Sequence, residues 1–257
     1  MNAPMTGNRR AAARRVIFAL DVSTLEEARR LVGLLKDRTG LFKVGMELFT
    51  AYGPEAVRAV QAEGGRVFLD LKFHDIPNTV SRAAEEALKL GVEMLNLHGC
   101  GGLEMMRETA ERCRRWAEKQ NRPNPILLAV TVLTSLDEGD LKEIGLTGPV
   151  EERVVRLAEL ARQAGLGGVV ASPREIESIR RHLGPKWVIV TPGVRPAFVP
   201  PGADDQKRVM TAKEAISAGA DYIVVGRPVR LSPDPAAAMD LVLAEVGEAT
   251  GSSEGST

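Results

Sequence analysis

The chain has 257 residues, of which 44% are hydrophobic, and this is enough for one sizeable domain with a single core. Its 34 lysines and arginines balance its 34 aspartates and glutamates, so no overall charge attracts nucleic acid or an anionic membrane, and we expect a small-molecule partner. Its two cysteines form no metal-binding or C-x-x-C pattern, and no apolar run approaches the roughly 20 residues that cross a bilayer, which predicts a protein of the reducing cytoplasm.

The two ends of the chain lack the apolar pattern of a folded core. Residues 1–14 carry several arginines and no acidic residue, which resembles an organellar transit peptide, but they lack the apolar segment of a secretory signal. Residues 247–257 are rich in glycine and serine. We therefore predict disordered tails over 1–14 and 247–257 and one folded domain over 15–246, with a targeting signal as the alternative for the first segment.

Short runs rich in β-branched residues recur between these tails and predict eight strands. In chain order they cover residues 16–22, 42–48, 66–73, 94–99, 126–135, 168–173, 187–194 and 222–228.

Segments with helical spacing separate the strands, for example residues 24–38, 78–91, 102–120 and 150–165. Several begin at a capping residue, such as Ser23 or Thr24 ahead of two glutamates, and several end at glycine. Eight nearly continuous apolar strands in strict alternation with helices favour a single (β/α)8 TIM barrel of the α/β class. An open doubly wound sheet is the alternative, because alternation alone does not show that the sheet closes.

In a barrel of this kind the polar residues at the carboxyl ends of the strands face a common mouth, where the active site lies. The rule selects Asp21, Lys43, Asp70, Lys72, Asp75, His98, Thr134, Ser135, Arg195, Gly226 and Arg227. We expect His98 to be a hydrogen-bonded structural residue, because the sequence offers it no evident acidic partner.

The third strand carries the densest group of charges. Asp70 and Lys72 are two residues apart, so strand geometry points both side chains to the same side, and Asp75 follows in the next loop. A structural ion pair at the rim would explain an isolated D-x-K. However, Lys43 and Asp21 add a second pair at the same mouth, and such an alternating array is costly to bury without a function. We expect the lysines to lower the pKa of Asp70 and the carboxylates to keep the lysines protonated.

The run DLKFHDIPNT (70–79) closely resembles the orotidine 5′-monophosphate decarboxylase family, as do FALDV, FKVGMEL, VTVLTS, TPGVRP and VVGRP elsewhere in the chain. The resemblance extends over roughly residues 16–230. It implies decarboxylation of orotidine 5′-monophosphate to UMP in pyrimidine biosynthesis, without a cofactor or a metal.

The same resemblance implies a role for each matching residue. Lys72 would donate a proton to C6 of the pyrimidine, and Asp70 would lie beside the departing carboxylate. Lys43 and Asp21 would bind the ribose hydroxyls. Asp75, with Ile76 and Thr79, would reach into the site of the other subunit of a homodimer with shared active sites.

The resemblance also implies where the rest of the nucleotide binds. Thr134 and Ser135 would touch the nucleotide and the pyrimidine amide edge, although two hydroxyls that close a turn are the alternative. The stretch 136–152 would partly cover the base. Phosphate binding would fall to Arg195, Gln206, Gly226 and Arg227, with 196–207 as a lid.

Two other functions stay open. A metal-dependent aldolase of the hexulose-6-phosphate synthase type also carries D-x-K-x-x-D, but its second-strand position is acidic where this chain has Lys43. A non-catalytic nucleotide-binding module would keep the pocket without the reaction.

Overall fold

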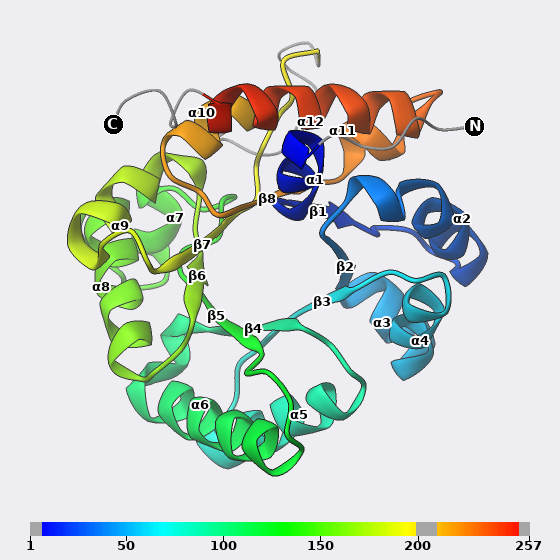
Figure 1. Cartoon of the computed structure of the whole chain (residues 1–257). Helices are drawn as coiled ribbons and strands as arrows, with labels where there is room; N and C mark the ends of the chain where they lie inside the picture. The colour runs from blue at the N-terminus through cyan, green and yellow to red at the C-terminus, as the bar shows by residue number, and fades with distance from the viewer. Residues whose placement is uncertain (1–6, 199–209, 252–257) are drawn as a thin grey trace.

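The computed structural model describes residues 7–198 and 210–251. Eight parallel strands pair in sequence order, and the eighth pairs with the first, so the sheet closes into a barrel. Figure 1 shows the ring of strands with the helices outside it. The prediction of a single (β/α)8 barrel is therefore confirmed, and the open sheet is excluded.

The strands are shorter than the sequence predicted at most of their ends. They are β1 (Val16–Ala19), β2 (Leu41–Gly45), β3 (Val67–Phe73), β4 (Met94–His98), β5 (Ile126–Val130), β6 (Gly168–Val170), β7 (Val188–Thr191) and β8 (Tyr222–Val225). The largest error is in the fifth strand, which ends five residues before the predicted end. In the second strand, residues 46–48 begin a helix and do not continue the sheet.

The α-helices alternate with these strands. They are α1 (Gly7–Arg14), α2 (Leu25–Leu35), α3 (Met46–Tyr52), α4 (Pro54–Ala62), α5 (Pro77–Lys89), α6 (Gly102–Lys119), α7 (Glu138–Glu143), α8 (Val150–Gln163), α9 (Ile176–Leu183), α10 (Ala212–Ser217), α11 (Arg227–Arg230) and α12 (Pro235–Gly251). Short 3-10 turns cover Lys36–Arg38, Gly99–Gly101 and Pro173–Glu175. The predicted cap of α2 is Thr24, whose hydroxyl accepts a hydrogen bond from the Glu27 N–H at 3.2 Å.

The boundaries of the domain differ from the expected ones at both ends. Helix α1 occupies the second half of the expected N-terminal tail, since Ala12 and Ala13 are buried and Arg9 forms an ion pair with Asp240 of α12. Figure 1 shows α1 against α12, and α12 itself continues to Gly251, past the expected start of the C-terminal tail. The expectations for 1–6 and 252–257 lie outside the described residues.

Two layers of apolar side chains hold the barrel together. The larger lies between the strands and the outer helices. The smaller fills the inside of the barrel, where Ile17, Leu41, Phe68, Met94 and Leu128 are buried against one another. Along each strand the next inward-facing position lies two residues further on, and on β2, β3 and β4 this position is polar, at Lys43, Asp70 and Asn96. This apolar layer forms the floor beneath the mouth.

Candidate active site

A cavity of about 260 Å³ opens at the carboxyl ends of the strands. Side chains from β1, β2 and β3 make its charged side, and residues that follow β5, β6 and β7 make an apolar side. Seven of the residues predicted from the sequence line it, namely Asp21, Lys43, Asp70, Lys72, Thr134, Gly226 and Arg227. The cavity thus gathers groups from almost the full length of the chain at the end of the barrel where such folds place their chemistry.

The charged side of the cavity is a row in which negative and positive groups alternate. Lys43 Nζ lies 3.0 Å from Asp21 Oδ1 and 3.4 Å from Asp70 Oδ2. Lys72 Nζ lies 2.7 Å from Asp70 Oδ1. The two lysines therefore share Asp70, one on each of its carboxylate oxygens, and we call Asp21, Lys43, Asp70 and Lys72 the charged row.

The pKa shifts of Asp70 and Lys43 have the predicted directions. Burial alone would raise the pKa of Asp70, but the charges of Lys43 and Lys72 and the hydrogen bonds from Lys72 and Asn96 outweigh it, and the pKa is lowered. Burial would likewise lower the pKa of Lys43, but Asp70 and Asp21 outweigh it, and that pKa is raised. At neutral pH the row therefore holds Asp70 as a carboxylate and Lys43 as an ammonium ion.

The backbone at Lys72 is strained. Its φ is 52°, and among the described residues only Lys72 and Asn121 combine a side chain with a positive φ. Such a conformation costs about 1–3 kcal/mol and persists where the surroundings impose it. The pairing of β3 with β4 shifts register between Leu69 and Phe73, so Lys72 lies in an irregular part of the strand. Asp70 and Lys72 do face the same cavity, as predicted, but the regular strand alternation assumed for that prediction does not hold at Lys72.

Asn96 belongs to this group and was missed by the sequence prediction. Its Oδ1 accepts the backbone N–H of Lys72 at 2.9 Å, and its Nδ2 donates to Asp70 Oδ1 at 2.7 Å. The signal was present in the sequence: Asn96 lies two residues after Met94 on β4, so it is a polar residue at an inward-facing position of the barrel.

The opposite side of the cavity is mainly apolar. Val130, Val132, Leu133, Val170 and Val194 contribute to it. Such a wall suits the flat face of an aromatic base, while the charged row faces the edge of the same ligand.

The end of the cavity near β8 combines a glycine with a cation. A β-carbon added at Gly226 would lie 3.2 Å from Cβ of Ala19, which is a tight contact. Arg227 follows directly, and Gly193, with φ of 81°, lies on the same lining. Backbone thus approaches the cavity closely beside a guanidinium group, which suits a phosphate.

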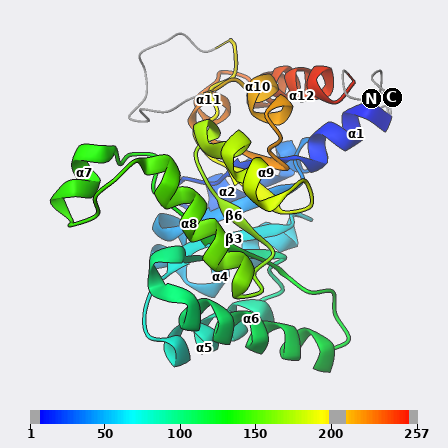
Figure 2. The ribbon, with the colours of Figure 1, turned by 90° about the vertical axis from the view of Figure 1, so that its left-hand side faces the viewer.

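Several predicted residues do not line this cavity. Asp75, Ile76 and Thr79 are exposed, and Ile76 keeps 66% of its surface accessible. The Asp75 carboxylate accepts the Ile76 N–H at 2.6 Å. Ser135 is exposed, and Arg195 is half-buried outside the lining. Gln206 and most of the expected lid lie outside the described residues, and the expected cover over 136–152 contains α7, which projects from the body in Figure 2.

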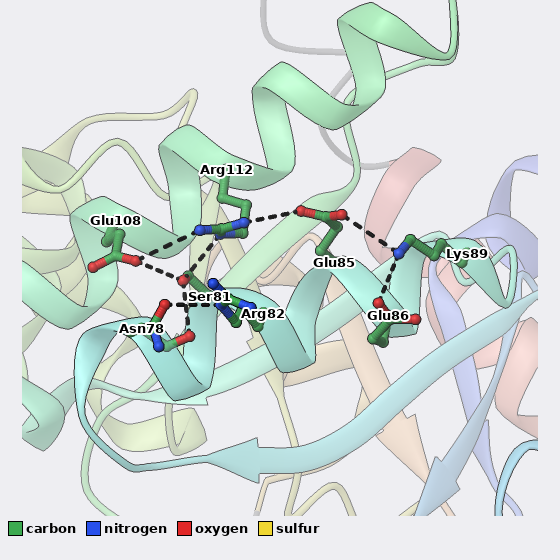
Figure 3. Close-up of polar contacts among 8 residues, drawn as sticks. All are labelled: Asn78, Ser81, Arg82, Glu85, Glu86, Lys89, Glu108 and Arg112. Carbon is green, nitrogen blue, oxygen red and sulfur yellow. Dashed lines mark hydrogen bonds and ion pairs between the residues drawn. The ribbon is translucent and has the colours of Figure 1, made fainter.

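Helix α5, which begins immediately after the Asp75 loop, is tied to α6 by polar contacts (Figure 3). The Ser81 hydroxyl donates to Glu108 at 2.7 Å and accepts from Arg112 Nε at 3.1 Å. Arg112 also lies 3.3 Å from Glu85. These contacts hold the helix that carries the exposed segment from Asp75 to Thr79 in a fixed position.

His98 is hydrogen-bonded, as expected. Its Nδ1 accepts the Cys100 N–H at 3.4 Å, and its ring stacks on His74 with the centroids 5.2 Å apart. Burial, with the charges of His74 and Lys72, lowers its pKa. It does not line the cavity.

Residues 14–242 match the model of a known family, described as orotidine 5′-phosphate decarboxylase / HUMPS. The chain belongs to this family. The orotidine 5′-phosphate decarboxylase of Pelobacter propionicus is 55% identical over 93% of this chain and 98% of its own length. That of Geobacter sulfurreducens is 55% identical over 91% and 97%. The crystal structure of the orotidine 5′-phosphate decarboxylase of Lactobacillus acidophilus superposes with a TM-score of 0.78 at 36% identity, covering 91% of this chain and 99% of the other.

Family membership agrees with the resemblance seen in DLKFHDIPNT, and the relatives named above are all decarboxylases. Within residues 7–198 and 210–251, no group of three or more His, Cys, Asp or Glu side chains is placed to hold a metal ion. In the same part of the chain, no helix is both long enough and apolar enough to cross a membrane.

Proposed function

We propose that this chain converts orotidine 5′-monophosphate to UMP by direct decarboxylation, with Lys72 as the proton donor. The observation that carries the proposal is the charged row, in which two ammonium groups flank one buried carboxylate. The same cavity has an apolar wall suited to a base, and Gly226 and Arg227 suited to a phosphate. In the reaction the bond between C6 and the carboxylate breaks and its electron pair stays on C6. Lys72 then transfers a proton to C6, and its neutral amine recovers a proton from solvent.

The row supplies electrostatic stabilisation as well as a proton. A positioned general acid contributes roughly 10²–10⁴-fold, which is about 5.5 kcal/mol at most. A difficult reaction needs up to about 23 kcal/mol. The remainder comes from cations that are already in place beside the carbon where negative charge develops, and from binding energy of the distant phosphate. Lys43 and Lys72 are held in place by Asp70 before the substrate arrives.

The nucleotide lies along the cavity from the row to β8. Asp21 and Lys43 bind the ribose hydroxyls, the apolar wall packs against the base, and Thr134 with Ser135 bonds the base and nucleotide. Arg227, Gly226 and Arg195 bind the phosphate, and Gln206 joins them from the lid. This orientation is supported by the rule that barrels of this kind bind phosphate after the seventh and eighth strands. Gly226 and Arg227 line the cavity there, and Gly226 lies so close to Ala19 that a β-carbon would make a tight contact.

The active unit is a homodimer in which Asp75, Ile76 and Thr79 complete the partner's site. Support comes from their exposure in the single chain and from their absence from its own cavity. An isoleucine with 66% of its surface exposed beside the mouth is explained by such an interface. The enzyme works in the cytoplasm on small molecules and needs neither nucleic acid nor a membrane.

Carbon dioxide release from orotidine 5′-monophosphate, measured with and without a chelator, tests the proposal. We expect release that the chelator does not change. A protein that binds UMP but releases no carbon dioxide would be a non-catalytic module. Chelator-sensitive turnover of a sugar phosphate, without release from the nucleotide, would instead identify the aldolase.

A further inference from the structure

We propose that Asn96 is a positioning residue for the reaction: it fixes both the carboxylate of Asp70 and the backbone from which the Lys72 side chain starts. Asn96 does not line the cavity, so it acts through the charged row and touches no substrate. The consequence for turnover rests on the proposed function. The geometric part of the inference does not.

The two hydrogen bonds of Asn96 require an amide. The Lys72 backbone N–H can only donate, and the ionised Asp70 carboxylate can only accept, so the Asn96 side chain must present its oxygen to one and its nitrogen to the other. A carboxylate at this position would lack the donor, and an apolar side chain would lack both groups. With 1% of its surface exposed, Asn96 has no access to water that could replace either bond.

The bond to Lys72 replaces a regular sheet contact. Opposite β4 the pairing of β3 shifts register between Leu69 and Phe73, and Lys72 lies inside this irregular stretch with its φ at 52°. The side chain of Asn96 reaches across from β4 to accept the Lys72 N–H there. It thereby stabilises the left-handed conformation of Lys72 against return to an ordinary strand conformation.

The bond to Asp70 fixes the direction of the carboxylate. Asp70 Oδ1 receives both Asn96 Nδ2 and Lys72 Nζ at 2.7 Å, which leaves Oδ2 for Lys43 at 3.4 Å. Without the amide, the carboxylate could rotate and both ammonium groups would follow it. Since a misplacement of about 1 Å can cost about 10²-fold in rate, the effect should appear in turnover.

A buried asparagine can also serve stability alone, so the test needs a matched control. Thr109 is fully buried in α6, and its hydroxyl donates to the Met105 carbonyl at 2.8 Å, on a helix outside the charged row. Thr109→Val removes a buried hydrogen bond and leaves the row intact. We expect it to lower stability without changing kcat.

Asn96→Leu, which removes both bonds and keeps a side chain branched at Cγ, should lower kcat roughly 10²-fold. KM should change far less, because the residues that bind the phosphate lie at the other end of the cavity and do not depend on Asp70. A kcat within about twofold of the natural enzyme, with stability lost as in Thr109→Val, would reduce Asn96 to a structural residue and overturn the proposal.

Asn96→Asp gives a second test if the leucine variant does not fold. Its new carboxyl faces Asp70, and two such close carboxylates raise the pKa of one of them. At low pH the shared proton lets the new carboxyl donate to Asp70 as the amide does, whereas at high pH the two groups repel. The ratio of its kcat to that of the natural enzyme should therefore fall as pH rises. A flat ratio would contradict the proposal.

Hydrogen exchange at the Lys72 backbone amide, followed by NMR, tests the geometry without reference to activity. Exchange should be faster in Asn96→Leu and nearly unchanged in Thr109→Val. If the natural protein releases no carbon dioxide, the proposed function fails, and this exchange result still decides the geometric part. Unchanged protection in Asn96→Leu would refute the bond to Lys72.

Discussion

Replacing Lys43 by methionine removes one of the two cations that hold Asp70 ionised, although the side chain of Asp70 is only 11% exposed. At the observed 3.4 Å, an effective dielectric constant of about 20 gives a Coulomb energy of about 5 kcal/mol for this pair. Burying the ammonium group itself opposes that gain, and Lys72 and Asn96 still compensate Asp70. We therefore expect a loss of about 3 kcal/mol in the free energy of unfolding, the lower end of the range for breaking a buried pair.

The loss should also depend on pH. The pKa of folded Asp70 lies below its ordinary value of 3.8, so its stabilising contribution is complete above that value and is lost as pH falls through the folded pKa. In Lys43→Met burial is less well opposed, and we expect the pKa of Asp70 to rise above its ordinary value, so that the carboxyl is partly protonated at pH 4.5 and ionised at pH 7.5. The difference in stability between the two proteins should therefore be larger at pH 7.5 than at pH 4.5.

Urea denaturation at both pH values, at one protein concentration, measures this difference. Lys89→Met is the matched control, because Lys89 makes the same kind of ion pair with Glu85 and Glu86 on an exposed surface, where such pairs stabilise little. If Lys43→Met is no more destabilised than this control, or if its deficit does not shrink in acid, the electrostatic account of the row is wrong.

Four further outcomes follow from the site and the core. Lys72→Ala should lose nearly all turnover yet still bind UMP in calorimetry, and near-normal turnover would exclude Lys72 as the proton donor. Mixing that variant with Asp75→Ala should restore activity, since each heterodimer regains one intact site; confirmed heterodimers without activity would contradict the shared site. Arg227→Ala should weaken the binding of UMP by about 1.5–3 kcal/mol, roughly 10- to 150-fold, and the binding of uridine far less. Equal losses of affinity for the two ligands would show that Arg227 does not bind the phosphate. Burial raises the pKa of Cys113 to about 12, so a thiol reagent at pH 8 should modify it only after unfolding, as mass spectrometry can show.

The sequence was sufficient to predict that the four residues of the charged row meet at the mouth, because the rule that connects them is simple. Strand order places Asp21, Lys43, Asp70 and Lys72 on one rim once the sheet is closed, and the structure brings each within 3.4 Å of a neighbour in the charged row. Closure itself is a property of long-range pairing between β1 and β8, which no local pattern encodes.

The conformation of Lys72 was beyond such reasoning. Nothing in D-L-K-F indicates a left-handed residue, since a lysine seldom adopts a positive φ. The conformation depends on a register shift against β4 and on the side chain of Asn96, 24 residues further along the chain. The same limit applies to α1, where burial of Ala12 against the barrel overrides the disorder suggested by composition.

The strain at Lys72 and the burial of the charges can be understood together. The row stands on an apolar floor that includes Phe68 and Met94, and in such surroundings its charges interact more strongly than they would in water. That strength serves catalysis only if the cations are already oriented when negative charge develops on the substrate. Because both cations are bound to Asp70, the orientation of a single carboxylate controls them both. The hydrogen bond that Asn96 donates to Asp70 from outside the cavity is therefore placed to control the orientation of both cations.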